Sequence, residues 1–168
     1  MQDLELQFNS LVRQYSEPLY WHVRSMVGSH EDADDLLQEI FIKAWKSLPS
    51  FRGDSDPFTW LWRIATNETI SHLRKARVRA ALSFSRLDDD AARICDPDPY
   101  FDGNAAMRAL RKAVMSLPDK QRQVFVMRYW DELSYEQISE ITGTSVGALK
   151  ASYHFAYDKI KSYLDKED

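Results

Sequence analysis

Cysteine, glycine and proline are scarce in this sequence, which has one Cys, five Gly and six Pro among 168 residues. The lone Cys95 cannot form an intramolecular disulfide. No apolar run approaches the roughly 18 residues that a membrane span requires. The first eight residues are acidic and lack the cationic and apolar parts of a signal peptide. These absences predict a cytoplasmic protein with no insertion into a membrane.

Positive charge is also limited, because the formal net charge is -4. An acidic chain does not coat nucleic acid by charge alone, although a local basic patch remains compatible with this total. The imbalance is concentrated in residues 82–104, which carry six acidic and two basic side chains. The hydrophobic content of 44% is sufficient to build globular cores.

Apolar residues recur at helical spacing through residues 8–23, residues 37–48 and the segment that follows Asp56. Ser29 with Asp32 predicts an N-terminal cap for the second helix, and Pro57 suits the first turn of the third. Strand-like alternation is not long enough anywhere to indicate a sheet, and the sequence has no internal repeat. The pattern predicts an all-α protein.

The periodicity fails after Leu82, where acidic residues are mixed with Pro97, Pro99 and Gly103. It resumes from Asn104. The sequence therefore predicts two small helical domains, residues 1–82 and residues 105–168, joined by a flexible acidic linker at residues 83–104.

The stretch SYEQISEITGTSVGALK, residues 134–150, has the pattern of a helix-turn-helix. Ser134 with Gln137 forms a capping box, Thr142 and Gly143 make a short turn, and Thr144 or Ser145 can cap the second helix. These features fit a plain helical hairpin as well as a DNA-reading unit, so the neighbouring segments must decide.

Three segments together resemble the extracytoplasmic-function (ECF) sigma factors of RNA polymerase, which belong to the sigma-70 family. LPDKQRQVFVMRYWDELSYEQISEITGTSVGALKASYHFAYDKI resembles their region 4, DADDLLQEIFIKAW their region 2.2, and FRGDSDPFTWLWRIATNETISHLRK their regions 2.3 and 2.4. The resemblance implies a transcription initiation factor that directs core RNA polymerase to promoters and is not an enzyme. It assigns residues 1–82 to region 2 and residues 105–168 to region 4.

The resemblance also implies partners and a docking face. Asp35, Gln38 and Glu39 match the polar face that binds the clamp helices of the polymerase beta-prime subunit. Leu37, Phe41 and Trp45 instead mostly pack the domain. Such charges guide docking and orientation. Further implied partners are the polymerase beta flap, promoter DNA, and an anti-sigma factor or other regulatory protein.

Region 2 of the family opens and reads the minus-10 element. Residues matching this role are Trp60, Trp62, Asn67, Arg74, Lys75 and Arg77. Exposed bases stack on planar side chains, and an amide such as that of Asn67 can bond a base edge. Core packing of the aromatics and a solvated, dipole-complementing helix end are the simpler interpretations.

Region 4 reads the minus-35 element with the second helix of the helix-turn-helix. The corresponding residues here are Ser145, Lys150, Ala151, Tyr153 and His154. Ala151, Ser152 and Phe155 depart from the family's usual serine and arginines, so the family's base preference does not transfer. The helix N-terminus and either Arg122 or Arg128 are the expected phosphate contacts.

The sequence contains no phosphate-binding loop, no His or Cys spacing typical of a metal site, and no paired nucleophile and base. We therefore expect no cofactor, no metal and no catalysis. Two alternatives stay open: a self-standing helix-turn-helix regulator that binds DNA as a dimer, and an adaptor that does not read DNA. A redox role for Cys95 is possible, but a lone linker cysteine is more often incidental.

Overall fold

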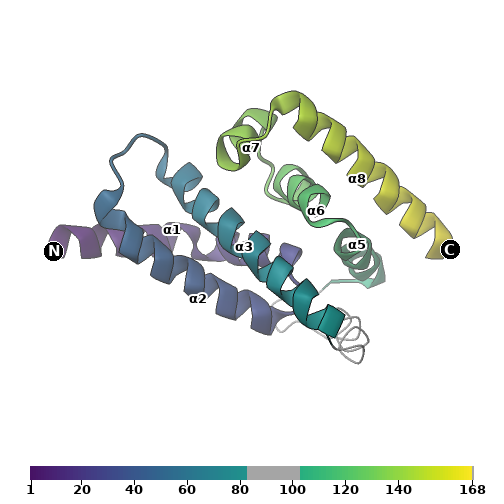
Figure 1. Ribbon diagram of the computed structural model, residues 1–168, viewed down its shortest axis with the longest axis horizontal. Coiled ribbons are helices and arrows are strands. Elements are labelled where there is room, and N and C mark those ends of the chain that lie inside the picture. Colours follow the sequence, from purple (N-terminus) through teal and green to yellow (C-terminus); the bar gives the residue numbers. More distant parts are fainter. Residues whose placement is uncertain (83–102, 168) are drawn as a thin grey trace.

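The computed structural model describes residues 1–82 and 103–167, and all regular structure within them is helical, which confirms the all-α prediction (Figure 1). Helices α1, α2 and α3 form one half of the molecule, and α5 to α8 form the other. The predicted linker falls almost wholly on residues 83–102, outside the described part, as does Cys95. The elements are α1 Gln2–Met26, α2 His30–Ser47, the 3₁₀ turn η1 Leu48–Ser50, α3 Pro57–Leu82, α5 Ala105–Met115, α6 Asp119–Phe125, the π-helical η2 Val126–Trp130, α7 Tyr135–Thr142 and α8 Val146–Glu167.

The helices of the first half begin where local chemistry favours it. The Ser29 hydroxyl accepts a hydrogen bond from the Asp32 amide at 3.2 Å, which confirms the predicted cap of α2. Asp56 Oδ1 accepts one from the Phe58 amide at 3.0 Å, and Pro57 is the first residue of α3. The apolar faces of the three helices then meet in a core. Its fully buried members include Leu19, Val23, Leu36, Ile40, Leu61 and Ala65.

The second half contains the predicted helix-turn-helix. Ser134 and Gln137 form a capping box at the start of α7, in which the Ser134 hydroxyl accepts from the Gln137 amide at 3.1 Å. Gly143 ends this helix with φ at +76°, a left-handed conformation that favours glycine. Ser145 accepts from the Ala148 amide at 3.2 Å and so caps α8. The helix-turn-helix geometry is therefore present.

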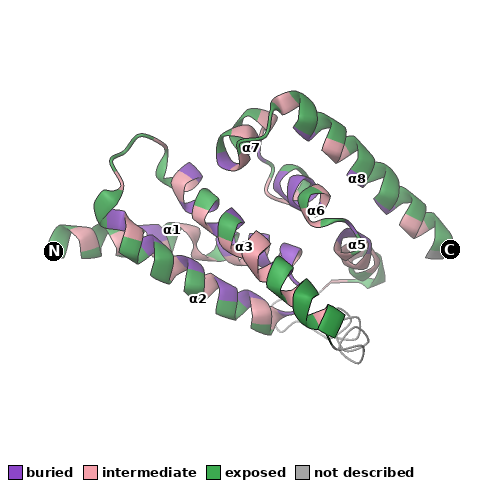
Figure 2. Ribbon diagram, viewed as in Figure 1, coloured by how far each residue is buried: buried purple, intermediate pink, exposed green. Residues whose placement is uncertain are grey.

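The two halves pack against each other. Helix α3 lies against α7, while α1 contacts both η2 and α5. One continuous group of buried apolar side chains extends through both halves. Figure 2 shows the result: purple buried segments face inward, whereas most of α8 and the last turns of α3 are exposed. The sequence alone does not predict this arrangement.

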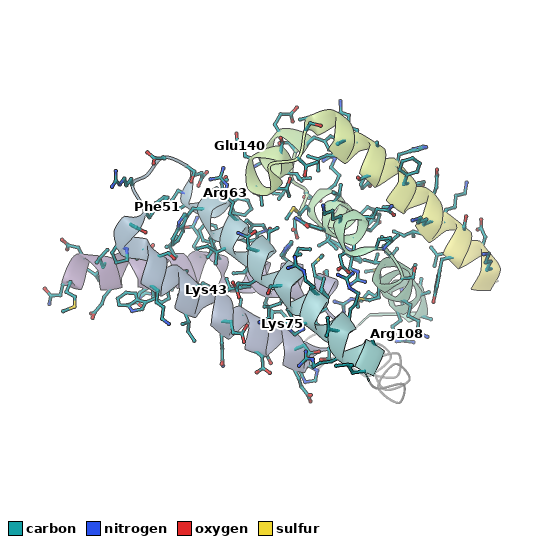
Figure 3. The ribbon with its side chains drawn as sticks, viewed as in Figure 1. Lys43, Phe51, Arg63, Lys75, Arg108 and Glu140 are labelled. Carbon is teal, nitrogen blue, oxygen red and sulfur yellow. The ribbon has the colours of Figure 1, made fainter. Side chains whose placement is uncertain are left out.

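Polar contacts across the seam include four pairs of residues. His22 Nδ1 lies 2.6 Å from Asp131 Oδ2, and Arg77 forms an ion pair with Asp119. Two arginines instead donate to main-chain carbonyls: Arg122 Nη1 to Met26 O at 2.8 Å, and Arg63 Nε to Glu140 O at 2.9 Å. Figure 3 shows Arg63 on α3 beside Glu140 on α7. The seam is thus specified by oriented hydrogen bonds as well as by apolar contact.

Candidate functional site

The first candidate surface lies on α2, where the predicted docking residues Asp35, Gln38 and Glu39 are all exposed. Their spacing of three and four residues places them along one side of the helix. The carboxylates of Asp35 and Glu39 make this side of the helix negative. The helix start, capped by Ser29, lies more than one turn before Asp35. The structure therefore brings these three side chains together on an accessible face.

An apolar groove adjoins this polar face between α1 and α2. It has a volume of 740 Å³, and Gln38 lines it together with Phe8 and Val12 of α1 and Leu37, Phe41, Ile42 and Trp45 of α2. Ile42 is 54% exposed and Trp45 is 39% exposed, although Trp45 also contacts the Phe8 ring edge-on at 5.2 Å. The expectation that Trp45 mostly packs the domain is therefore only partly right. A solvent-facing apolar groove is a feature that the sequence interpretation missed.

Helix α3 carries the residues predicted for the minus-10 element, and they divide into four groups. Asn67, Arg74 and Lys75 are exposed, and Figure 3 shows Lys75 toward the C-terminal end of α3. Arg77 is exposed but already paired with Asp119 of α6. Trp60 is half-buried, with its ring 4.9 Å from that of Phe51. These residues do not form one continuous free surface in the packed arrangement.

Trp62 differs from the other minus-10 candidates because it is only 1% exposed. Its ring stacks on Phe58 at 4.1 Å and meets Tyr15 edge-on at 6.0 Å. The indole N–H has no hydrogen-bond partner. In this arrangement Trp62 is a core residue and cannot stack on a base, so the simpler interpretation of core packing holds for it.

The residues predicted for the minus-35 element lie along α8. Lys150, Ala151 and His154 are exposed, and Ser145 is occupied as the helix cap. His154 Nε2 lies 3.3 Å from Asp158 Oδ2, one turn further along the same helix. The carboxylate of Asp158 therefore neighbours the proposed DNA-reading side chain and opposes a close approach of phosphate.

Tyr153 is half-buried within a cluster of aromatic rings. Its ring is nearly parallel to that of Phe125, at 5.7 Å and 11°, and it meets Tyr135 edge-on at 6.3 Å. Burial, and secondly the neighbouring Tyr135, raise the pKa of the Tyr153 hydroxyl. Arg128 and Lys150 both lie over the Tyr135 ring, at 5.1 and 5.8 Å. Tyr135 thus holds two cations at the helix-turn-helix, a role that the sequence interpretation did not assign.

Arg122 does not serve as the expected phosphate contact. Its guanidinium is buried and donates to three carbonyls, those of Met26 at 2.8 Å, Met115 at 2.8 Å and Leu117 at 3.1 Å. Burial lowers its pKa, although Asp119 acts in the opposite direction. Arg122 is a structural residue of the seam, and Arg128 alone of this pair remains accessible.

Comparison with known proteins connects both surfaces to one family. The model of sigma-70 region 2 matches residues 11–79, and that of sigma-70 region 4 matches residues 107–160. The ECF RNA polymerase sigma factor SigW of Bacillus subtilis is 31% identical over 165 residues, which cover 94% of this chain and 88% of SigW. The chain is an ECF sigma factor of the sigma-70 family. Sigma factors initiate transcription and are not enzymes, so this chain is not an enzyme.

Other relatives agree with this assignment. The sigma factor YlaC of Bacillus subtilis is 31% identical over 157 residues, covering 93% of this chain and 91% of YlaC. The ECF sigma-E factor of Escherichia coli K12 is 32% identical over 161 residues, covering 91% of this chain and 84% of the relative. The presence of region 2 in this sigma factor removes the alternative of a self-standing helix-turn-helix regulator.

Solved structures share the fold of this sigma factor. RpoE of Bartonella quintana, in complex with the anti-sigma factor NepR, aligns with a TM-score of 0.74 at 24% identity over 95% of this chain and 97% of RpoE. CnrH, in complex with the cytosolic domain of CnrY, aligns with a TM-score of 0.71 at 23% identity over 98% of this chain and 91% of CnrH. Within residues 1–82 and 103–167, none of the helices is long and apolar enough to span a membrane.

Proposed function

We propose that this sigma factor binds core RNA polymerase through α2 and directs it to promoters, reading the minus-10 element with α3 and the minus-35 element with α8. Residues 1–82 act as region 2 and residues 105–168 as region 4, with residues 83–104 as the tether. The site of action is the cytoplasm, where polymerase and promoter DNA meet. The observation that carries the proposal is the exposed polar face of α2 beside an apolar groove, on a chain that belongs to this family.

The α2 surface suits the clamp helices of the beta-prime subunit in two respects. Asp35 and Glu39 supply negative charge for a basic partner helix, which guides encounter and orientation. Ile42 and Trp45 supply apolar area that can be buried on docking, which contributes affinity. Charge and apolar contact thus lie side by side on one accessible face.

DNA reading requires the two halves to separate at least in part. Asp119 of the second half is paired with Arg77, so this guanidinium is free to contact DNA only when the seam opens. Asn67, Arg74 and Lys75 remain exposed and are the residues on which minus-10 contact can begin. Core polymerase, which holds regions 2 and 4 apart along the promoter, supplies the binding energy that opens the seam. The beta flap then holds region 4, where Lys150, Ala151 and His154 face the minus-35 bases.

An anti-sigma factor is the proposed regulator. RpoE of Bartonella quintana, a solved structure with the same fold, is bound to the anti-sigma factor NepR. A regulator that covers the α2 face competes directly with polymerase, because both need Asp35, Gln38 and Glu39.

The test is abortive transcription with core polymerase on a genomic promoter library, with and without the sigma factor. We expect specific new start sites that are lost with Glu39→Lys and with Asn67→Ala. Glu17→Lys and Gln14→Ala on the exposed surface of α1 are the matched controls, and they should leave initiation unchanged. Initiation that survives Glu39→Lys would remove α2 as the docking face. Absence of any start site with the wild-type chain would overturn the proposal.

A further inference from the structure

Two cations from other elements lie over the ring of Tyr135, the first residue of α7. Arg128 of η2 places its Cζ 5.1 Å from the ring centre, and Lys150 of α8 places its Nζ 5.8 Å from it. Both distances fall within the roughly 6 Å at which the negative face of an aromatic ring attracts a cation. Three separate elements of the helix-turn-helix half thus converge on one side chain.

The two cations differ in how firmly they are held. Arg128 Nη1 also donates a hydrogen bond to the Leu133 carbonyl at 3.1 Å, which fixes the guanidinium independently of the ring. The Lys150 ammonium forms no hydrogen bond or ion pair within residues 1–82 and 103–167. A lysine stem is flexible, and ordering it costs rotamer entropy. The ring of Tyr135 is therefore the contact that limits where this ammonium lies.

The pair of cations also keeps its positive charge. Glu132 and Glu136 are close in sequence to Tyr135, but in the part of the chain that the structure describes neither forms an ion pair with these cations. Both cations are exposed. Like charges held on one ring repel each other, and an anion that contacts both relieves that repulsion. The arrangement is therefore suited to an anionic partner.

The place of this pair in the helix-turn-helix favours a DNA phosphate as the anion. In this motif the first helix crosses the DNA backbone, while the second lies in the major groove. Lys150 belongs to the second turn of α8, yet its ammonium lies over a ring that belongs to α7. The ammonium is thus on the side where the backbone passes. Along one DNA strand, phosphates recur about every 3.4 Å of helix axis, so neighbouring phosphates can meet both cations.

We propose that Tyr135 is a positioning residue for DNA binding, whose ring holds the Lys150 ammonium beside Arg128 so that both cations bind phosphates of one strand. The ring acts through the negative charge of its face, and its hydroxyl makes no contact with DNA. Holding Lys150 in place before DNA arrives lowers the entropy lost on binding. The meaning for the minus-35 element rests on the proposed function, in which Lys150 then contacts the backbone and Ala151 and His154 remain to read bases.

The contact itself is tested by NMR of the free, full-length chain. Protons above an aromatic ring resonate upfield, so the ε-methylene of Lys150 should lie upfield of that of Lys166, an exposed lysine near the end of the same helix. Lys150→Gln assigns the resonance. We expect Tyr135→Phe to keep the upfield shift and Tyr135→Leu to abolish it. A wild-type Lys150 resonance that coincides with that of Lys166 would overturn the proposal without any variant having to fold.

The phosphate contact is tested at low salt with the full-length chain and two short DNA duplexes of unrelated sequence. Lys150→Gln should weaken binding to both duplexes alike, and it should lower the slope of log affinity against log salt by about one. Lys166→Gln is the matched control and should change neither quantity. A loss of affinity for only one of the duplexes would assign Lys150 to a base and overturn the proposal.

The role of the ring is isolated by placing phenylalanine, or fully fluorinated phenylalanine, at Tyr135. The two rings have nearly the same shape, but fluorine withdraws the negative charge from the face that attracts the cation. We expect Tyr135→Phe to bind DNA as the wild type does, and the fluorinated ring to bind it about threefold more weakly. In the Lys150→Gln background the two rings should bind DNA equally.

Two results would contradict this role of the ring. Weaker binding by Tyr135→Phe would show that the hydroxyl contacts DNA. Equal binding by the two rings while Lys150 is present would show that the ring serves only for packing.

These measurements need neither polymerase nor a promoter. Binding of both duplexes as described, without any initiation in the abortive transcription assay, would keep this site and overturn the proposed function. Absence of binding to either duplex, alongside normal initiation with polymerase, would do the reverse.

Discussion

His22 Nδ1 lies 2.6 Å from Asp131 Oδ2 and thereby joins α1 of the first half to the residue that follows η2 in the second. The side chains are only 1% and 12% exposed. An ionised carboxylate can only accept, so Nδ1 carries the proton of this bond. A charge-assisted bond shielded from water contributes more than a surface pair, and its position at the seam makes it a determinant of packing.

Asp131→Asn should therefore weaken the packing of the two halves. The loss of the carboxylate removes the charge-assisted bond to buried His22, at a cost of about 2 kcal/mol. We expect a larger radius of gyration in small-angle X-ray scattering. Glu136→Gln, which neutralises an exposed acid on α7, is the control and should leave the radius unchanged. Identical scattering from Asp131→Asn and the wild type would show that this pair does not hold the seam.

Even a conservative replacement of Arg122 should destabilise the protein. Its donors reach three carbonyls in two directions, and an ammonium on a flexible stem cannot reproduce that planar fork. We expect Arg122→Lys to lower the free energy of unfolding by about 2 kcal/mol and Arg122→Met by more, since Met leaves the carbonyls unpaired. Urea denaturation measures both. Wild-type stability in Arg122→Lys would contradict the assigned role.

Two glycines of the helix-turn-helix should respond to alanine in opposite directions. Gly143→Ala places a side chain at φ +76° and should cost about 1 kcal/mol, although the added Cβ meets no neighbour. Gly147 lies in the first turn of α8, where an added Cβ also meets nothing, so Gly147→Ala should stabilise by about 0.5 kcal/mol. Thermal unfolding of the two variants provides the comparison. Equal changes in melting temperature for the two variants would show that backbone conformation does not distinguish these two glycines.

The contribution of the apolar α2 groove to polymerase binding can be measured separately from that of the charged residues. Ile42→Ser should weaken binding to core polymerase about tenfold, because Ile42 lines the groove and is 54% exposed in the free chain. Val78→Ser is the matched control, since Val78 is 57% exposed on α3 and lies outside the groove. Fluorescence anisotropy with labelled sigma factor measures the affinity. Unchanged affinity in Ile42→Ser would limit docking to the polar face.

The helices and their caps were predictable because they depend on residues within one turn of each other. Ser29 with Asp32, Pro57 in α3, and Ser134 with Gln137 carry that information locally. The seam was not predictable, since His22 and Asp131 are 109 residues apart and nothing near either one identifies its partner. Secondary structure is thus encoded in short windows, whereas the packing of the halves is not.

The aromatic residues show the same limit of prediction from sequence, here at single positions. The family resemblance implied packing for Trp45 and base stacking for Trp62, yet Trp45 is 39% exposed and Trp62 1%. Arg122 was misjudged for a related reason, because a guanidinium serves a phosphate or a set of carbonyls equally well. Only burial distinguishes these uses, and burial depends on contacts between helices: Trp62 packs on Tyr15 of α1, and Arg122 reaches the Met26 carbonyl of the other half.

Two of the seam contacts end on main-chain oxygens, those of Met26 and Glu140. A carbonyl is supplied by whichever amino acid occupies the position, so exchanging either side chain leaves the acceptor in place. For the contact with exposed Glu140, tolerance to substitution is consequently unequal: substitutions that release the halves should arise at Arg63 and not at Glu140. A selection for constitutively open variants would therefore report only the donor of this bond.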